Sequence, residues 1–327
     1  MRFIVFGAGA VGGVVGARLH QSGHDVTLIA RGEHAAAIAR DGLVLIAPGE
    51  HTSLPIPVVT GPAELDWTVP ATVLLSVKGQ DTIGALEPLA AAAPPSTPVV
   101  CMQNGVENER LVLRRFANTY GVCVMCATTH LRPGVVEAHY GPVTGLLDIG
   151  RYPRGEDDVS LAVSAALRAA HFGSLSRADI MYWKYRKLLL NLSNAVEALC
   201  GPGAARSELS ALARREGEAC LRAAGIAFAS SEEDAERRRE LFPTLASVGS
   251  PERVVRSGGG STWQSLARGA SSVEADCLNG EIVLLGRLHG VPTPVNELLR
   301  RLVVEAARSG SPPGGHDVDE LLAVLNG

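Results

Sequence analysis

The sequence predicts an N-terminal α/β domain with a doubly wound, largely parallel sheet, followed by an all-α domain. In the first half, short apolar runs rich in β-branched residues alternate with helix-like segments. The runs lack the polar–apolar alternation of a half-exposed strand, which is typical of parallel strands buried on both faces. After about Ser176 such runs end, and Ala, Leu, Glu and Arg recur at helical spacing.

The N-terminus predicts a strand, a glycine turn, a helix and a second strand. Arg2–Phe6 is a continuous β-rich run, and Gly7–Gly13 breaks it before a helix over Val14–Gln21. The second strand is expected at Val26–Ala30. Further parallel strands are expected at three later apolar runs, which are Val73–Val77, Val99–Met102 and Gly121–Ala127.

The later chain predicts where the first domain ends. Val135–Ile149 is β-rich, and a turn at Gly141-Pro142 predicts antiparallel strands there. Beyond this segment only helical periodicity follows. We therefore place an α/β domain over residues 1–175 and a helical domain over residues 176–327.

Composition and charge exclude several classes of function. The chain has 327 residues, is 46% hydrophobic and 20% charged, and carries a net charge of −4, which is the balance of a globular protein with a core. Nucleic-acid and anionic-membrane binders concentrate Lys and Arg, so neither partner is expected. Opposite charges stand four apart in two pairs, Glu233/Arg237 and Asp234/Arg238. These pairs predict a solvated helix face with ion pairs.

No secretion signal, membrane span or metal site is expected. The strand Arg2–Phe6 leaves no room for a cleavable leader, and prolines interrupt the apolar stretch Ala85–Met102. Six cysteines in a chain this long do not form a disulfide framework, and reduced thiols suit a cytoplasmic enzyme. Cys123 and Cys126 stand i, i+3 in an expected buried strand and point to opposite faces, so they are core thiols.

A glycine motif follows the first strand and opens the first helix. Its residues are Gly7, Ala8, Gly9, Ala10, Val11 and Gly12. The first glycine makes a tight turn, the second lets the backbone approach a pyrophosphate, and the third permits close helix–strand packing. The helix N-terminus favours the negative charge. In this strand–turn–helix context the motif predicts a Rossmann-type dinucleotide site.

The end of the second strand indicates which dinucleotide is bound. NAD enzymes usually carry Asp or Glu about 20 residues past the motif's start, where it binds the ribose 2′-hydroxyl. Here the strand runs into Arg31, and Asp25 comes too early. A guanidinium can bind a 2′-phosphate through two hydrogen bonds, so NADPH is the expected cofactor. The alternative is that Arg31 is an ordinary surface charge.

A polar stripe marks one helix of the second half. Lys187, Asn191 and Asn194 stand at i, i+4 and i+7 in a Leu-rich stretch. The stripe is either the water face of the helix or the lining of a cleft against the other domain. The second interpretation suits hydride chemistry, because an ammonium can bind and protonate a ketone oxygen as negative charge develops on it.

Taken together, the chain resembles the ketopantoate reductase (2-dehydropantoate 2-reductase) family along nearly its whole length. The matching pieces beside the glycine motif and Arg31 are Ser76-Val77-Lys78, Gln103 to Asn108, Trp183, Lys187 to Asn191, Glu274-Ala275-Asp276 and Asn279-Gly280. The resemblance implies a Rossmann-type domain, a helical substrate domain and an NADPH-dependent reduction of a small 2-oxo acid. It also implies that Lys78 assists Arg31 near the 2′-phosphate.

The resemblance implies a role for four further residues. Lys187 would protonate the 2-oxo oxygen of the substrate. Asn104 would lie beside the nicotinamide and the substrate. Asn191 would bind the substrate through its amide, and Glu274 would accept a hydrogen bond from the substrate hydroxyl. Taken alone, Asn104-Gly105 would be an ordinary turn and Glu274 an ordinary first-turn acid of a helix.

Ser261 and Thr262 follow a glycine run at an expected helix start. Their hydroxyls and the free backbone N–H groups there could bind the substrate carboxylate. The alternative is that Ser261 only caps the helix.

The chain departs from the family pattern at three places that bear on the pocket. The family's second helix asparagine is Ala195 here, with Asn194 beside it. Its serine pair is Ser261-Thr262, followed by the bulky Trp263, and its glutamine after the cofactor lysine is Asp81.

Three hypotheses follow from the sequence. The first is an NADPH-dependent reductase that converts ketopantoate to pantoate, for pantothenate and coenzyme A synthesis. The second is a paralogue that reduces another branched or bulkier 2-oxo acid. The third is a sensor that binds NADPH without turnover. A homodimer through the helical domain is compatible with the sequence, although no single stripe indicates one.

Overall fold

The computed structural model describes residues 1–241 and 259–326, and they form two compact units. Among the described residues, the first unit contains Met1–Gln103, Glu107–Lys184 and 230–241. The second contains Asn104–Val106, Tyr185–Ala229 and 259–326. The predicted architecture is confirmed, because the first unit is an α/β unit with a mostly parallel sheet and the second is helical.

The chain crosses between the units later than the expected 175/176 boundary. It passes from the first unit to the second at Lys184/Tyr185, inside helix α6 (Ile180–Asn191). Helix α9 (Ser231–Leu241) then belongs to the first unit, although the sequence grouped it with the second.

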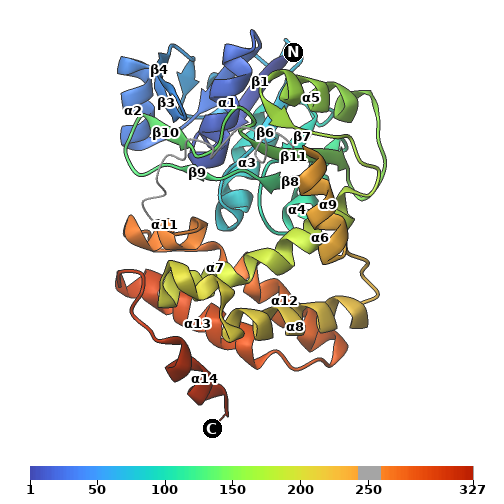
Figure 1. Ribbon diagram of the computed structural model, residues 1–327. Coiled ribbons are helices and arrows are strands. Elements are labelled where there is room, and N and C mark those ends of the chain that lie inside the picture. The colour runs from blue at the N-terminus through green and yellow to red at the C-terminus, as the bar shows by residue number, and fades with distance from the viewer. Residues whose placement is uncertain (242–258, 327) are drawn as a thin grey trace. The chain divides into compact units, whose positions relative to one another are not determined.

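The first unit is built on an eight-stranded sheet in the order β12-β11-β8-β7-β6-β1-β2-β5. Figure 1 labels β1, β6, β7, β8 and β11 of this sheet. All neighbours in it are parallel except β8 and β11. Its strands are β1 (Arg2–Phe6), β2 (Asp25–Ile29), β5 (Val58–Val59), β6 (Thr72–Leu75), β7 (Val99–Cys101), β8 (Thr119–Met125), β11 (Gly145–Arg151) and β12 (Phe172–Gly173).

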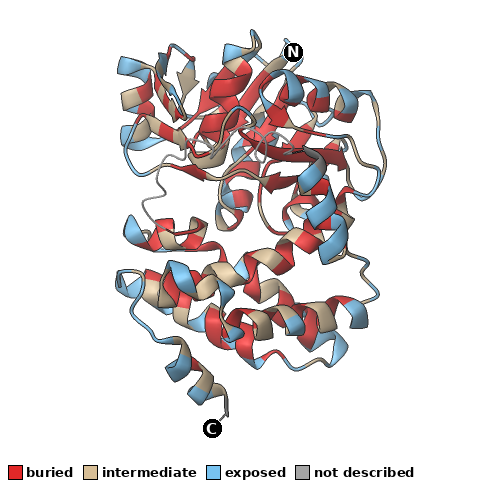
Figure 2. Ribbon diagram, in the orientation of Figure 1, coloured by how far each residue is buried: buried red, intermediate tan, exposed pale blue. Residues whose placement is uncertain are grey.

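Both faces of this sheet are buried, as the continuous apolar runs predicted (Figure 2). Along β1, Phe3 and Val5 pack into one hydrophobic cluster, and Ile4 and Phe6 pack into another on the opposite face. Helices α1 (Ala10–Gln21), α2 (Gly32–Asp41) and α5 (Asp158–Ala169) contribute to the first cluster. Helices α3 (Thr82–Ala92) and α4 (Asn108–Leu113) contribute to the second.

A second, four-stranded sheet in the order β4-β3-β10-β9 was not predicted. It corrects the expectation for Val135–Ile149, because β10 and β11 do not pair with each other. β11 is antiparallel, but to β8, while β10 pairs in parallel with β3 and antiparallel with β9. The strands of this sheet are β3 (Leu43–Ala47), β4 (Glu50–Leu54), β9 (Thr128–Thr129) and β10 (Val135–Ala138).

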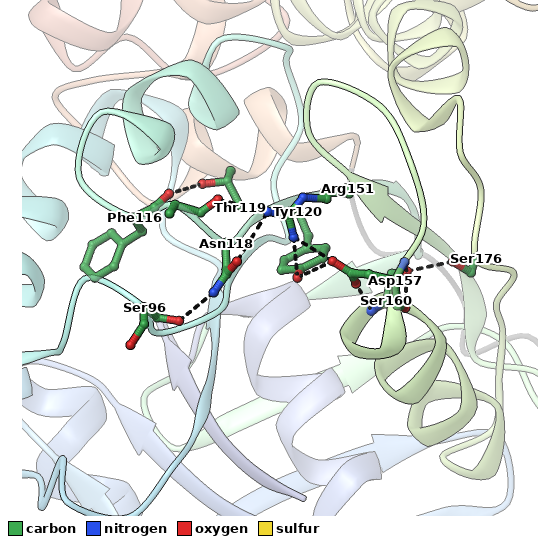
Figure 3. A network of polar contacts seen from close by, with 10 residues as sticks. Ser96, Phe116, Asn118, Thr119, Tyr120, Arg151, Asp157, Ser160 and Ser176 are labelled. Atoms are coloured by element: carbon green, nitrogen blue, oxygen red, sulfur yellow. Dashed lines mark hydrogen bonds and ion pairs between the residues drawn. The ribbon is translucent and has the colours of Figure 1, made fainter.

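A polar network joins β8, β11 and the start of α5 (Figure 3). The carboxylate of Asp157 accepts hydrogen bonds from the Tyr120 hydroxyl at 2.9 Å, from Arg151 at 2.6 Å and from the Ser160 amide at 3.0 Å. Burial opposes the charge, but these donors prevail and lower the pKa of Asp157. Burial and the neighbouring carboxylate raise the pKa of Tyr120. Asp157 therefore caps α5 as an anion.

Helix α9 is held to the first unit by a buried ion pair. Arg237 is 2% exposed, and its Nε lies 2.7 Å from Oδ2 of Asp148, whose side chain is fully buried. Arg177 binds the same oxygen. The guanidinium carbons of Arg177 and Arg237 lie 4.3 and 5.5 Å from the centre of the Trp183 ring, within the range of cation–π contacts.

The expected solvated face of α9 is therefore only half correct. Asp234 and Arg238 form the expected pair at 2.6 Å. Glu233 instead accepts a hydrogen bond from the Tyr182 hydroxyl at 2.9 Å, because Arg237 turns inward to Asp148. Spacing alone could not show which face of the helix meets the sheet.

The second unit is a group of helices with polar residues in its core. The Asn279 amide donates to Oδ1 of Asn296 at 3.0 Å, and the Asn296 amide donates to the Ala213 carbonyl at 2.9 Å. The carboxylate of Glu216 accepts the backbone N–H groups of Val295 and Asn296 at the start of α13. The other elements of this unit are α7 (Ser193–Cys200), η3 (Pro202–Arg206), α8 (Glu208–Ala223), α11 (Ser261–Ala267), η4 (Glu274–Cys277), α12 (Asn279–His289), α13 (Pro294–Ser309) and α14 (Val318–Asn326).

None of the helices in residues 1–241 and 259–326 has the length and apolar character needed to cross a membrane.

We predict that Asp148→Ala strongly destabilises the protein. The change leaves Arg237 as a buried charge without its carboxylate, which costs about 3–5 kcal/mol in comparable pairs. Glu218→Ala is the matched control, because its partner Arg222 is 64% exposed, and such pairs contribute about 0–1 kcal/mol. Urea unfolding followed by circular dichroism measures both. Equal losses in the two variants would contradict the role given to Asp148.

Candidate active site

The glycine motif lies where the carboxyl ends of three neighbouring strands meet. β1 pairs with β2 on one side and with β6 on the other, all in parallel. The Gly7 N–H donates to the Ile29 carbonyl at 3.1 Å, and the Ser76 N–H donates to the Phe6 carbonyl at 2.8 Å. The chain order reverses at β1, and open α/β sheets bind ligands at such a position.

Two of the three glycines in the motif are required by the close packing of the fold itself. Gly7 has a φ of +104°, and a Cβ there would lie 2.7 Å from the Val77 nitrogen. A Cβ on Gly12 would lie 2.1 Å from the Gly7 carbonyl oxygen. A Cβ on Gly9 would meet nothing within 4 Å, so the fold itself does not require glycine there. Helix α1 begins at Ala10 and not at the expected Val14. Gly12 and Gly13 therefore lie inside the helix, where the lack of a side chain allows close packing.

His34 forms a hydrogen bond with the backbone of the glycine motif, at the Ala8 carbonyl. This residue was not predicted from the sequence. Its Nδ1 accepts the N–H of Gly134 at 2.8 Å, so Nε2 carries the proton and donates to the Ala8 carbonyl at 2.7 Å. Burial lowers the pKa of His34. A second proton on the ring would face the Gly134 N–H, so this arrangement requires neutral imidazole. Of the other motif residues, Ala8 is buried and Ala10 and Val11 are half-buried.

The two cationic candidates follow the two strands that flank β1. Arg31 is exposed and comes after β2, at the start of α2. Lys78 is half-buried and comes after β6, at the start of the short helix η2 (Gly79–Asp81). Both therefore stand at the same edge of the sheet as the glycine turn.

Asn104 follows β7, the next strand along the sheet. The preceding Gln103 is 4% exposed, and its amide donates to the Val77 carbonyl at 2.9 Å and to the Thr82 hydroxyl at 2.8 Å. Gly105 has a φ of +80°, which allows the turn expected there. Asn104 itself is half-buried and belongs to the second unit.

A buried ion pair lies behind Gln103, and the sequence did not reveal it. Lys184 Nζ lies 2.8 Å from Oε1 of Glu109, with side-chain exposures of 2% and 0%. The same ammonium donates to the carbonyls of Gln103 at 2.9 Å and Val122 at 3.1 Å. One lysine therefore connects α6, α4, β8 and the end of β7 within the first unit.

The polar stripe on α6 and α7 is only partly as expected. Lys187 and Asn194 are half-buried, and Asn191 is 3% exposed. Asn191 therefore does not lie on a solvent-exposed face of the helix. The stripe is also not on one helix, because α6 ends at Asn191 and α7 begins at Ser193, with Leu192 between them.

The second unit brings Ser261 and Glu274 together. The Ser261 hydroxyl donates to Oε2 of Glu274 at 3.3 Å, and Glu274 is 6% exposed at the start of η4. Thr262 is 3% exposed. The N–H of Gly260 just before them donates to the carboxylate of Glu197 at 2.8 Å. The sequence predicted that free N–H groups at this helix start could bind a substrate carboxylate. The Gly260 N–H is not one of them, because it already donates to Glu197.

The two cysteines that stand i, i+3 in β8 and just after it have separate partners. The Cys123 thiol donates to the Trp183 carbonyl, and the Cys126 thiol donates to the Thr144 carbonyl. Burial raises the pKa of Cys126 to about 12. In residues 1–241 and 259–326, no three His, Cys, Asp or Glu side chains are grouped as a metal site.

Comparison with known proteins assigns the chain to a family. The model of "Ketopantoate reductase PanE/ApbA" matches residues 3–154, and that of the C-terminal part of the same family matches residues 179–307. The chain belongs to the ketopantoate reductase PanE/ApbA family. It is thus a 2-dehydropantoate 2-reductase-like oxidoreductase, and the resemblance found in the sequence is confirmed.

Relatives of this family match nearly end to end. The 2-dehydropantoate 2-reductase of Pyrococcus horikoshii is 29% identical, with 93% of this chain and 96% of the relative covered. That of Mesorhizobium japonicum is 31% identical, with 93% and 98% covered.

Two solved structures are similar to this chain. The PanE/ApbA family ketopantoate reductase of Ralstonia eutropha has a TM-score of 0.78 and 30% identity, with 95% of this chain and 99% of that chain covered. A D-mandelate dehydrogenase bound to NADH and anilino(oxo)acetate has the same TM-score and coverage at 24% identity, and so shares the fold.

The departures from the family pattern have structural settings. Ala195 is 1% exposed, while the neighbouring Asn194 lines a cavity with Gly260. A Cβ on Gly259 would lie 2.6 Å from Cγ of Trp263, so this ring packs against the glycine. Asp81 is exposed. Gly258, the first glycine of the run, lies outside the described residues.

We predict that the single variant Lys184→Met is less stable than the double variant Lys184→Met/Glu109→Leu. The single change leaves the Glu109 carboxylate buried without its cation, which costs about 3–5 kcal/mol, whereas apolar replacement of both partners is often far milder. Denaturant unfolding of the two variants and the wild type measures this. A double variant that is as unstable as the single one would count against the pair as described.

We predict that His34 makes stability depend on pH below about neutrality. Its pKa in the folded state is lower than the ordinary 6.5, so its contribution is present above pH 6.5 and is lost as the pH falls through the folded value. His34→Gln offers the same donor and acceptor without titration. The stability advantage of wild type over His34→Gln should therefore shrink between pH 8 and pH 5. A constant difference over that range would refute the neutral, doubly bonded ring.

Proposed function

We propose that the protein reduces a small 2-oxo acid with NADPH, and that 2-dehydropantoate is this acid, giving pantoate for pantothenate and coenzyme A synthesis. Membership of the family supports the reaction class. The observation that carries the proposal is the setting of the glycine motif at the reversal point of a parallel sheet, in the same chain as a half-buried Lys187 and a buried Glu274.

The residues at the sheet edge support a nicotinamide dinucleotide. Gly9 has open space where its side chain would stand, which leaves room for a pyrophosphate close to the backbone of Gly7 to Gly12. β2 ends at Ile29, and Ala30 and Arg31 follow it. A guanidinium in place of a carboxylate favours NADPH over NADH, with Lys78 as the second cation.

A bound nicotinamide would supply a hydride to the carbonyl carbon. Negative charge then develops on the carbonyl oxygen, and Lys187 donates a proton to it. Glu274 accepts a hydrogen bond from the hydroxyl that forms. Its carboxylate is already oriented by the Ser261 hydroxyl.

The other lysine of α6 cannot take this role. Lys184 Nζ has three N–H groups, and Glu109, Gln103 and Val122 provide three acceptors within 3.1 Å. No donor remains for a substrate. Lys187, one turn further along, is half-buried, which is the setting of an ammonium that must exchange its proton.

Four further residues complete the proposed substrate site. Asn191 and Asn104 bind the substrate through their amides. Asn194 and Thr262 belong to the second unit, where Asn194 lines a cavity and Thr262 is buried.

A second candidate is the reduction of a bulkier 2-oxo acid. The buried Ala195 and the large Trp263 beside Gly259 are the residues that favour it. An assay of 2-dehydropantoate against aromatic and branched oxo acids, with NADPH and NADH in parallel, decides between the two. Cofactor binding with no turnover on any acid would instead indicate a sensor.

We predict that Lys187→Ala lowers kcat by about 100- to 10,000-fold, the usual contribution of a positioned proton donor, with little change in NADPH affinity. Arg287→Ala is the control, because Arg287 is an exposed cation on α12, and it should keep full turnover. NADPH oxidation at 340 nm gives the rates, and fluorescence titration gives the affinity. Undiminished turnover in Lys187→Ala would remove this lysine from the mechanism.

A further inference from the structure

The second unit contains a polar cavity beside the proposed substrate residues. Its volume is about 490 Å³, which is enough for a small metabolite. It is lined by residues of α7, η3 and the segment before α11, namely Asn194, Glu197, Pro202, Gly203, Ala205, Arg206 and Gly260. A carboxylate, an amide and a guanidinium thus provide most of its chemistry.

Glu197 is a charged residue built into the wall of this cavity. It is 8% exposed, and its Oε2 accepts the N–H of Gly260 at 2.8 Å. A Cβ on Gly260 would lie 2.6 Å from that oxygen, so only glycine lets the carboxylate approach the backbone. Burying a carboxylate is costly unless it gains polar partners, and one backbone N–H compensates only part of that cost.

Two residues of the cavity wall are neighbours in sequence of residues proposed to hold the reacting end of the substrate, because Gly260 directly precedes Ser261 and Asn194 follows Asn191 by three positions. Asn194 stands one turn before Glu197 on α7, and its Oδ1 would lie 3.5 Å from a Cβ on Gly260. The next residue, Ser261, donates to Glu274. A ligand whose hydroxyl reached Glu274 would therefore direct its remote end toward Glu197 and Asn194.

We infer that this cavity is a specificity subsite for the remote end of the oxo acid, and that Glu197 selects an end that carries a hydrogen-bond donor. The inference rests on the proposed function. A hydrocarbon end would strip water from Glu197 and Asn194 and return no hydrogen bond. A hydroxyl end donates to the carboxylate, and Arg206 at the exposed side of the cavity limits the negative charge there.

Two acids that differ by one hydroxyl test the inference. 2-Dehydropantoate carries a terminal hydroxyl, and 3,3-dimethyl-2-oxobutanoate has the same branched skeleton without it. We expect wild type to prefer the first acid by about 10- to 100-fold in kcat/KM, as one hydrogen bond to a charged group gives. Glu197→Leu should abolish most of that preference by raising KM for the hydroxylated acid only. Glu208→Gln, an exposed acid on α8, is the control and should keep the preference.

Calorimetry of the two hydroxy-acid products, pantoate and 2-hydroxy-3,3-dimethylbutanoate, gives a readout that does not need turnover. Loss of affinity for pantoate alone in Glu197→Leu would support the subsite. If Glu197→Leu weakens both acids and both products equally, Glu197 only holds α11 in place and the inference fails. If wild type reduces both acids but with no preference, the subsite fails while the proposed function stands. If neither acid is reduced nor either product bound, both are overturned.

Discussion

The close approach of backbone at the glycine turn sets the architecture of the first unit. Gly12 stands where a single methyl group would lie 2.1 Å from the Gly7 carbonyl oxygen. Helix α1 can therefore pack directly on the strand that precedes it, and β1 can pair with both β2 and β6. This pairing makes β1 the point where the chain order reverses, so the edge that carries Gly7 also carries Arg31 and Lys78.

Buried charges fix the remaining elements, and each has a partner close by. Lys184 with Glu109 connects α6 to α4 and the end of β7, while Asp148 with Arg237 holds α9 to the sheet. Glu197 binds the backbone before α11. Such groups add little net stability compared with apolar packing, but a wrong arrangement would leave an uncompensated charge. They therefore select one arrangement of elements whose apolar surfaces alone could pack in several ways.

The sequence predicted those features of the fold that depend on local residue patterns. The apolar runs gave the parallel strands, and the spacing from Gly7 to Gly12 gave the turn, because both follow from periodicity and steric need. The β3–β4 hairpin was missed although β3 is an apolar run, because its partner β4 is polar and mostly not buried. His34, Glu109 and Glu197 were missed because their partners, Gly134, Lys184 and Gly260, are distant in sequence. The pairing Glu233/Arg237 was wrong for the same reason, since a distant Asp148 attracts Arg237 more strongly than a solvated neighbour does.

Charge around Gly260 and Ser261 bears on how the proposed anionic substrate would be held. The sequence suggested that amides at the start of α11 would take the substrate carboxylate, but Glu197 occupies the N–H of Gly260 and Glu274 faces Ser261. Two buried carboxylates in this segment repel a third. In the proposed function, neutral donors such as Asn191 and the ammonium of Lys187 would therefore suit the acid end of the substrate better than the start of α11 would. The same two carboxylates are hydrogen-bond acceptors, so in the proposed function they match hydroxyl groups, both the one that the reaction would create and one carried elsewhere on the substrate.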